Sequence, residues 1–266
     1  MDNLTLKLVV TPALIGAATL AGRRWGQAIG GWLVGLPLTT GPVAFFIALD
    51  HGAPFAAAAV VGSLVGAVAE AAFSVAYGRS AARSGWLASL LAGSVAYAGV
   101  AAVLQGLGLG PVVLFALVIA SLTASLRLLP PATRGAAPAP PPGWDLPARM
   151  VLATAVVLVI TGLAPRLGAR LSGLLATYPL FAAILTAFGH RHEGAGAAIS
   201  VLRGLLFGLF SFASFCLVLA FGLVPLGIPV GFAVAIVIML AVQGLALWRL
   251  RSPRGPLLTR PVGPPT

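Results

Sequence analysis

Charged residues are scarce in this chain. Of its 266 residues only 8% are Asp, Glu, Lys or Arg, and only five are acidic. By contrast, 59% of the residues are hydrophobic and the mean hydropathy is +1.05. Since soluble globular domains carry about 25% charged residues, this composition excludes an ordinary soluble domain and predicts a membrane protein.

The chain also lacks the residues from which many enzyme and metal sites are built. Its single cysteine, Cys216, excludes a disulfide framework and a thiolate metal site. There is no phosphate loop, no nucleotide fingerprint and no nucleophile with a partnered base. We therefore expect no enzyme activity, no cofactor and no ATP-driven pumping. The strand alternation of a membrane barrel is absent as well.

Long apolar runs are what the chain has in abundance. Segmentation at charges and turn residues predicts nine membrane helices, each close to the ~20 residues that cross the hydrocarbon core. Their ranges are 5–22, 27–49, 54–78, 86–107, 111–129, 147–164, 169–189, 195–222 and 228–249. The expected fold class is an all-α integral membrane protein with nine transmembrane helices.

The arginines predict the orientation of these helices. With nine crossings most arginines fall on one side of the membrane, against Lys7, Arg166 and Arg170 on the other. The positive-inside rule places the N-terminus outside and the C-terminus in the cytoplasm, in a plasma (inner) membrane. The net charge of +11 is then mostly a topology signal, with anionic lipids rather than nucleic acid as the expected partner.

An internal repeat runs through the chain at a constant offset of 142 residues. It aligns Pro37 with Pro179 without a gap, and it also pairs several glycines and phenylalanines. Such pairs include Gly31 and Gly173, Phe46 and Phe188, Gly52 and Gly194, Gly62 and Gly204, Gly66 and Gly208, and Phe73 and Phe215. Because five helices precede the second copy, and five is odd, the two copies are predicted to be inverted in the membrane.

The repeat also sets the expected domain organisation. Residues 1–108 form the first repeat, with helices one to four, and residues 147–250 form the second, with helices six to nine. Between them, 109–146 hold a connector helix and a Pro/Ala-rich cytoplasmic linker. Residues 251–266 are expected to be a disordered basic tail.

The second helix of each repeat carries backbone-breaking residues in mid-membrane. The first copy reads Gly35-Leu36-Pro37-Leu38-Thr39-Thr40-Gly41-Pro42, and the second reads Ala176-Thr177-Tyr178-Pro179. Prolines remove amide donors, and freed backbone groups in hydrocarbon are tolerated only inside protein or beside a wet cavity. We therefore expect a polar substrate site here, with ordinary packing kinks as the alternative. The candidate substrate-binding residues are Pro37, Thr39, Thr40, Thr177, Tyr178 and Pro179.

Two ionisable residues lie inside predicted helices. Glu70 and Arg203 are at similar depths from the cytoplasmic side, on equivalent helices of the two repeats. Because intramembrane charges are costly and commonly functional, we hypothesise a Glu70–Arg203 contact that serves as a cytoplasmic gate, or a free Arg203 that anchors an anion. The alternatives are a static packing ion pair and snorkelling of Arg203 to the headgroups.

The densest polar cluster is the run from His190 to Glu193. Two histidines two positions apart do not share a helical face, and no further ligand is nearby in sequence. We interpret this run as a solvated loop and expect no metal there. The Gly62/Gly66 and Gly204/Gly208 pairs are interpreted as close-packing motifs.

The second repeat resembles the GlpM-like small membrane proteins. The resemblance lies in the segment Gly173 to Ala182, with its Tyr178-Pro179-Leu180-Phe181 core, in Leu202-Arg203, and in Leu206 to Leu209. It implies a four-helix unit and an association with envelope polysaccharide production. This chain departs from that pattern because it is a fused double unit with two prolines in its first copy.

These observations favour a small secondary transporter or translocator, with a substrate site between broken helices two and seven. The expected substrate is an anionic or hydroxyl-rich small molecule, since half-helix N-termini and an intramembrane arginine favour anions. The alternatives are a non-catalytic membrane subunit or scaffold for envelope polysaccharide biosynthesis and, third, a lipid-modifying enzyme. Expected partners are membrane lipids and the substrate. The sequence does not decide between a monomer and a homodimer.

Overall fold

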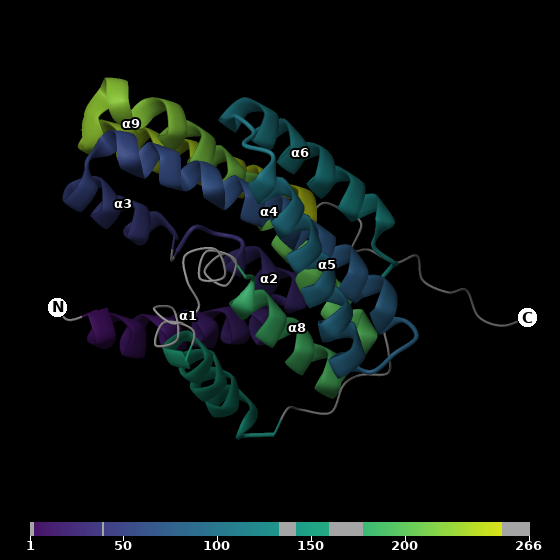
Figure 1. Ribbon diagram of the computed structural model, residues 1–266. Helices are drawn as coiled ribbons and strands as arrows, with labels where there is room; N and C mark the ends of the chain where they lie inside the picture. The colour runs from purple at the N-terminus through teal and green to yellow at the C-terminus, as the bar shows by residue number, and fades with distance from the viewer. Residues whose placement is uncertain (1–2, 39, 133–141, 160–177, 252–266) are drawn as a thin grey trace, which may run out of the picture.

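The computed structural model describes residues 3–38, 40–132, 142–159 and 178–251, and within them every element of regular structure is a helix (Figure 1). The first six helices are α1 (Asn3–Trp25), α2 (Gln27–Val34), α3 (Thr40–His51), α4 (Ala53–Ala81), α5 (Trp86–Gly106) and α6 (Pro111–Leu128). A further helix covers 145–159, followed by α8 (Leu180–Glu193) and α9 (Ala195–Arg251).

Four of the described helices are long and apolar enough to cross a membrane, namely Ala53–Ala81, Trp86–Gly106, Pro111–Leu128 and Ala195–Leu250. This agrees with an α-helical membrane protein. One predicted segment is divided differently in the structure, because 27–49 is split into α2 and α3. The segments 195–222 and 228–249 both lie in α9, which consists of two helices that meet at a kink at Gly227, where φ is 75°. This agrees with the two separate helices predicted there.

Several helix boundaries recur at the 142-residue offset of the sequence repeat. Asn3 begins α1 and Asp145 begins the helix at 145–159. Gly52 and Gly194, which separate α3 from α4 and α8 from α9, have φ values of 86° and 88°. This left-handed conformation is readily available only to glycine, so a glycine forms the joint between helices at both positions.

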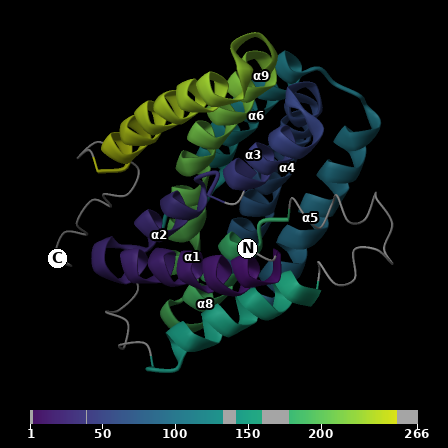
Figure 2. The same cartoon turned by 90° about the vertical axis from the view of Figure 1, so that its left-hand side faces the viewer.

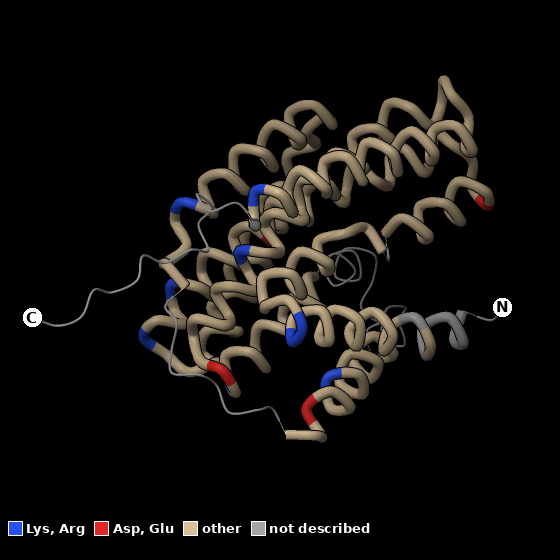
Figure 3. Tube along the Cα trace, turned by 180° about the vertical axis from the view of Figure 1, so that it is seen from behind, with Lys and Arg blue, Asp and Glu red and all other residues tan. Residues whose placement is uncertain are grey.

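The helices lie in two groups that the two views agree on. Helices α3, α4, α6 and α9 lie together in the upper part of Figures 1 and 2, and α1, α8 and the helix at 145–159 lie in the lower part. The main apolar core includes Phe73 of α4 and Leu206 and Phe215 of α9, and it extends to α5 and α8. Most charged positions lie at or near helix ends (Figure 3), as expected for helices with an apolar environment around their middles.

Helices α2 and α9 cross backbone to backbone through glycines. A Cβ atom on Gly31 would lie 1.9 Å from the carbonyl oxygen of Val201, and one on Gly204 would lie 1.9 Å from the carbonyl oxygen of Ala28. Gly35 and Gly208 meet in the same way one turn further along. The Gly204/Gly208 pair therefore has the close-packing role expected of it. A Cβ on Gly62 has no neighbour within 4 Å among the described residues.

Candidate functional site

The predicted break in helix two is confirmed. Helix α2 ends at Val34 and α3 begins at Thr40, so the buried Pro37 lies between two short helices. Pro37 cannot donate a hydrogen bond and crowds the turn before it. Two short-range backbone hydrogen bonds span the break. The Gly41 amide donates to the Pro37 carbonyl at 2.8 Å, and the Leu38 amide donates to the Leu36 carbonyl at 2.8 Å.

A side chain from the part of α9 that follows Gly227 satisfies a backbone group that the break leaves without a helical partner. The carbonyl of Trp32 lies in the last turn of α2 and has no partner inside that helix. Gln243 of α9, which is 3% exposed, donates from Nε2 to this carbonyl at 3.1 Å and accepts a hydrogen bond from the Ser211 hydroxyl. Gln243 is not among the candidate residues predicted from the sequence, although an amide side chain in an apolar helix is itself a signal of such a partner.

The second break is described only on its C-terminal side. Helix α8 begins at Leu180, directly after Pro179, and Ala183 donates from its amide to the Pro179 carbonyl at 2.8 Å. Thr177 and the rest of 160–177 lie outside the described residues, as does Thr39. The structure therefore shows that a helix starts at each of the two proline segments.

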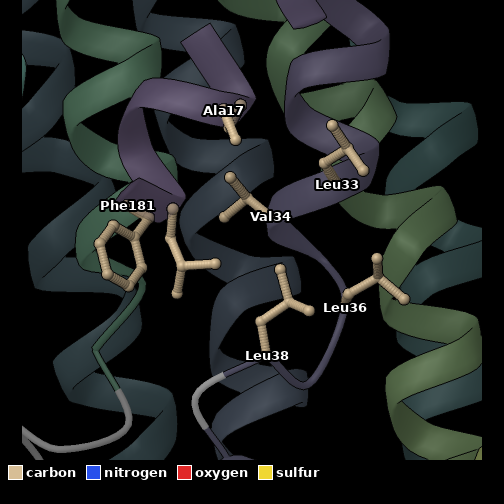
Figure 4. Close-up of a pocket in the computed structure, with 8 residues that line it drawn as sticks. Ala17, Leu33, Val34, Leu36, Leu38 and Phe181 are labelled. Atoms are coloured by element: carbon tan, nitrogen blue, oxygen red, sulfur yellow. The ribbon is translucent and has the colours of Figure 1, made fainter. Parts of the chain in front are cut away.

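A small cavity of about 70 Å³ is lined by residues next to the two prolines, and we call it the break cavity (Figure 4). Its described walls come from α1, the end of α2, the broken segment and the start of α8. They are Leu14, Ala17, Ala18, Leu33, Val34, Leu36, Leu38 and Phe181. These side chains are all apolar, so the described part of the break cavity lacks the polar lining expected from the sequence. It is also well below the ~300 Å³ typical of small-molecule sites.

The candidate hydroxyl residues that are described do not converge on this cavity. Thr40 is half-buried at the start of α3. Tyr178 instead faces α5, where its hydroxyl lies 2.7 Å from the hydroxyl of Ser94 and its ring packs edge-on against Tyr97. Tyr178 therefore links α8 to α5 in this conformation.

Glu70 and Arg203 do not form the hypothesised ion pair. The half-buried Glu70 carboxylate has no ion pair or hydrogen bond with any described residue. Arg203, only 5% exposed, donates from Nη2 to the carbonyl oxygen of Pro130 at 3.0 Å. The carbonyls just after a helix lack intrahelical partners, and α6 ends at Leu128, so Arg203 satisfies one of them and ties α9 to α6.

The ion pairs of the described chain gather instead on Asp145. Its carboxylate is fully buried and lies 2.7 Å from Nη2 of Arg23, 2.9 Å from Nε of Arg149 and 3.5 Å from Nε2 of His192. We call these four residues the Asp145 cluster. They join the end of α1, the start of the helix at 145–159 and the end of α8. Next to it, Gln27 of α2 donates to the Glu193 carboxylate at 2.6 Å.

The Asp145 cluster holds more positive than negative charge. Two guanidinium groups share one carboxylate, and Arg149 is only 2% exposed, with its guanidinium 5.0 Å from the centre of the Phe188 ring. Charge pairs that are buried in this way are costly to break, because one partner is left without compensation. The sequence shows the Asp145–Arg149 spacing of four, but nothing in it links them to Arg23 and His192.

His190, on the last turn of α8, faces away from this cluster. Its Nδ1 lies 3.3 Å from the hydroxyl of Tyr77 on α4, and burial lowers the pKa of His190 below its ordinary value. The described residues contain no group of three or more His, Cys, Asp or Glu side chains placed to hold a metal. The polar run 190–193 is thus used for contacts between helices, where a solvated loop had been expected.

A second, larger cavity of about 560 Å³ opens between α5, the helix at 145–159 and α8, and we call it the α8 groove. Its walls are mostly apolar, and its polar groups are the Tyr178 hydroxyl at one end and Arg191, His192 and two tryptophans at the other. The volume is within the range of small-molecule sites.

Comparison with known proteins gave no matching family model, no matching curated protein and no matching solved structure.

Proposed function

We propose that this protein is a small secondary transporter whose nine membrane helices form two inverted four-helix repeats. One observation carries the proposal: residues next to both proline breaks, Leu36 and Leu38 beside Pro37 and Phe181 just after Pro179, line the same cavity. Transporters with inverted repeats bind substrate at such discontinuous helices near the bilayer midplane. The recurrence of helix boundaries at the repeat offset supports the same architecture.

The apolar walls of the break cavity alter the substrate that we propose. A hydroxyl-rich molecule would lose hydrogen bonds against Leu33, Val34 and Leu38. An amphipathic anion fits better, since its apolar part would contact these walls. Its anionic group would then lie at the N-terminal ends of α3 and α8, where unpaired amides and the helix dipole favour negative charge.

The Asp145 cluster takes the gating role that we had assigned to Glu70 and Arg203. It connects α1, α8 and the helix at 145–159 at the end that the arginine distribution places in the cytoplasm. At the opposite end, Asp50 is the repeat equivalent of His192; it is exposed and has no ion pair among the described residues. This asymmetry supports a conformation that is closed on the cytoplasmic side.

Site-directed labelling tests this proposal without knowledge of the substrate. Leu38→Cys in a Cys216→Ser background places one thiol at the break cavity, and a membrane-impermeant maleimide is applied to either face of proteoliposomes. We expect labelling from the outside only, and additional labelling from the cytoplasmic side when Arg23→Gln weakens the Asp145 cluster. Asp50→Cys serves as a control that labels from outside in both backgrounds.

An unchanged labelling pattern would contradict the transporter proposal. A scaffold without alternating access would give Leu38→Cys labelling that Arg23→Gln leaves unchanged. That result, with normal labelling of Asp50→Cys, would overturn the transporter proposal.

A further inference from the structure

The α8 groove has the dimensions of one leaflet of a bilayer. Its α8 wall is a single helical face, because its residues follow one another at spacings of three or one along the helix. These wall residues are Leu180, Ala183, Ile184, Ala187, Phe188, Arg191 and His192. From Leu180 to Arg191 the helix rises about 16 Å, which is about half of the ~30 Å hydrocarbon core. The groove thus reaches from one membrane surface to the midplane, where Pro179 breaks the helix.

Two aromatic pairs flank the polar end of the groove. The guanidinium of Arg191 lies 5.8 Å from the centre of the Trp86 ring, and the ring of His192 lies 5.6 Å from that of Trp144. Tryptophans are enriched at the level of the lipid headgroups. Both pairs therefore indicate that this end of the groove lies at the membrane surface.

The charge at this end is unbalanced. His192 is engaged with the buried Asp145 carboxylate at 3.5 Å. Arg191 is exposed and forms no ion pair with any described residue, and no described wall residue of the groove is acidic. The groove therefore offers one uncompensated cation above an apolar channel.

We infer that the α8 groove binds an anionic glycerophospholipid, with its phosphate at Arg191 and one acyl chain along α8 toward Tyr178. The apolar walls match an acyl chain, while the free guanidinium matches a phosphate group, to which arginine donates two parallel hydrogen bonds. The positive-inside orientation also places Arg191 in the leaflet that carries anionic lipid. This inference depends on the membrane location of the chain but not on transport.

The test is lipid binding to the purified full-length protein, measured by titration in detergent with dioleoyl phosphatidylglycerol and dioleoyl phosphatidylcholine. The two lipids have the same chains and differ in net charge. We expect the wild type to bind the anionic lipid about fivefold more tightly, and Arg191→Gln to remove this preference. Arg191→Lys should retain most of it.

Arg249→Gln is the matched control, since Arg249 also stacks on a tryptophan, Trp248, at 5.5 Å but lies outside the groove. We expect it to keep the wild-type preference. Ala187→Phe fills the apolar channel and should weaken both lipids about equally. Inorganic phosphate at millimolar concentration should not compete, because it has no acyl chain.

Three results would overturn the inference. They are equal binding of the two lipids by the wild type, equal effects of Arg191→Gln and Arg249→Gln, and displacement of the lipid by phosphate alone. The last result would identify Arg191 as a site for a soluble anion. Each can occur whether or not the Leu38→Cys labelling supports transport, so failure of one proposal does not imply failure of the other.

Discussion

The middle of this molecule and its predicted cytoplasmic end differ in the kind of polar group that they contain. In the middle, the break around Pro37 exposes backbone groups, yet the described side chains around it are apolar and the polar contacts are hydrogen bonds between neutral groups. At the end, side-chain charges gather on one fully buried carboxylate. Backbone irregularity and ionic chemistry are thus separated in space.

This separation suggests different mechanical roles for the two regions. A conformational change at the break replaces a few neutral hydrogen bonds, each contributing about 1 kcal/mol. A change at the Asp145 cluster must separate buried charges, which costs several kcal/mol. We therefore expect the break to bend readily and the Asp145 cluster to hold α1, α8 and the helix at 145–159 together.

The largest expected effect comes from removing the central carboxylate. Asp145→Asn leaves the nearly buried Arg149 without a counter-charge, so we expect the free energy of unfolding to fall by about 3–5 kcal/mol. Equilibrium unfolding in mixed micelles measures this change. Asp50→Asn, at the exposed repeat equivalent of His192, should change it by less than about 0.5 kcal/mol. Equal effects of the two substitutions would show that the buried Asp145 cluster stabilises the protein no more than an exposed carboxylate does.

A smaller effect is expected at the break. Gln243→Leu removes the donor to the Trp32 carbonyl, and we expect a loss of about 1–2 kcal/mol in the free energy of unfolding because that partly buried carbonyl loses its side-chain partner. Gln105→Leu on α5 is the matched control, since Gln105 is exposed. If both glutamines gave the same small change, the Trp32 carbonyl would have found another partner and the break would be looser than its hydrogen bonds indicate.

The smallest effect concerns Tyr178, which the sequence places in a substrate site and the structure places against Ser94. A double-mutant cycle of Tyr178→Phe and Ser94→Ala should give a coupling of about 0.6 kcal/mol in the free energy of unfolding, the average for membrane hydrogen bonds. Absence of coupling would mean that the Tyr178 hydroxyl is free to face a ligand. The middle of the molecule would then hold more polar chemistry than this conformation shows.

The sequence predicts those features that depend on local residue types. Pro37 breaks its helix because proline lacks an amide hydrogen, and the joints at Gly52 and Gly194 follow from glycine's tolerance of positive φ. Arg23 and Asp145 are 122 positions apart. No local pattern indicates that they meet, because their contact depends on how α1 and the helix at 145–159 pack.

The error about Glu70 and Arg203 has a related cause. Similar depth in the membrane is a necessary condition for contact but leaves open which way each helix faces. Arg203 found a partner in the carbonyl of Pro130 just beyond α6. Pairing charged side chains by sign cannot predict a backbone carbonyl as the partner of an arginine.

The glycine crossing of α2 and α9 also constrains how the protein is made. Gly31 packs against the backbone of Val201, and Gly204 against that of Ala28, so this interface cannot form until about 170 further residues have been synthesised after α2. At about 5–20 residues per second this takes roughly 10–30 s. During that interval the bare glycine face of α2 is without its partner. During biogenesis α2 is therefore inserted in the membrane before it can pack against α9.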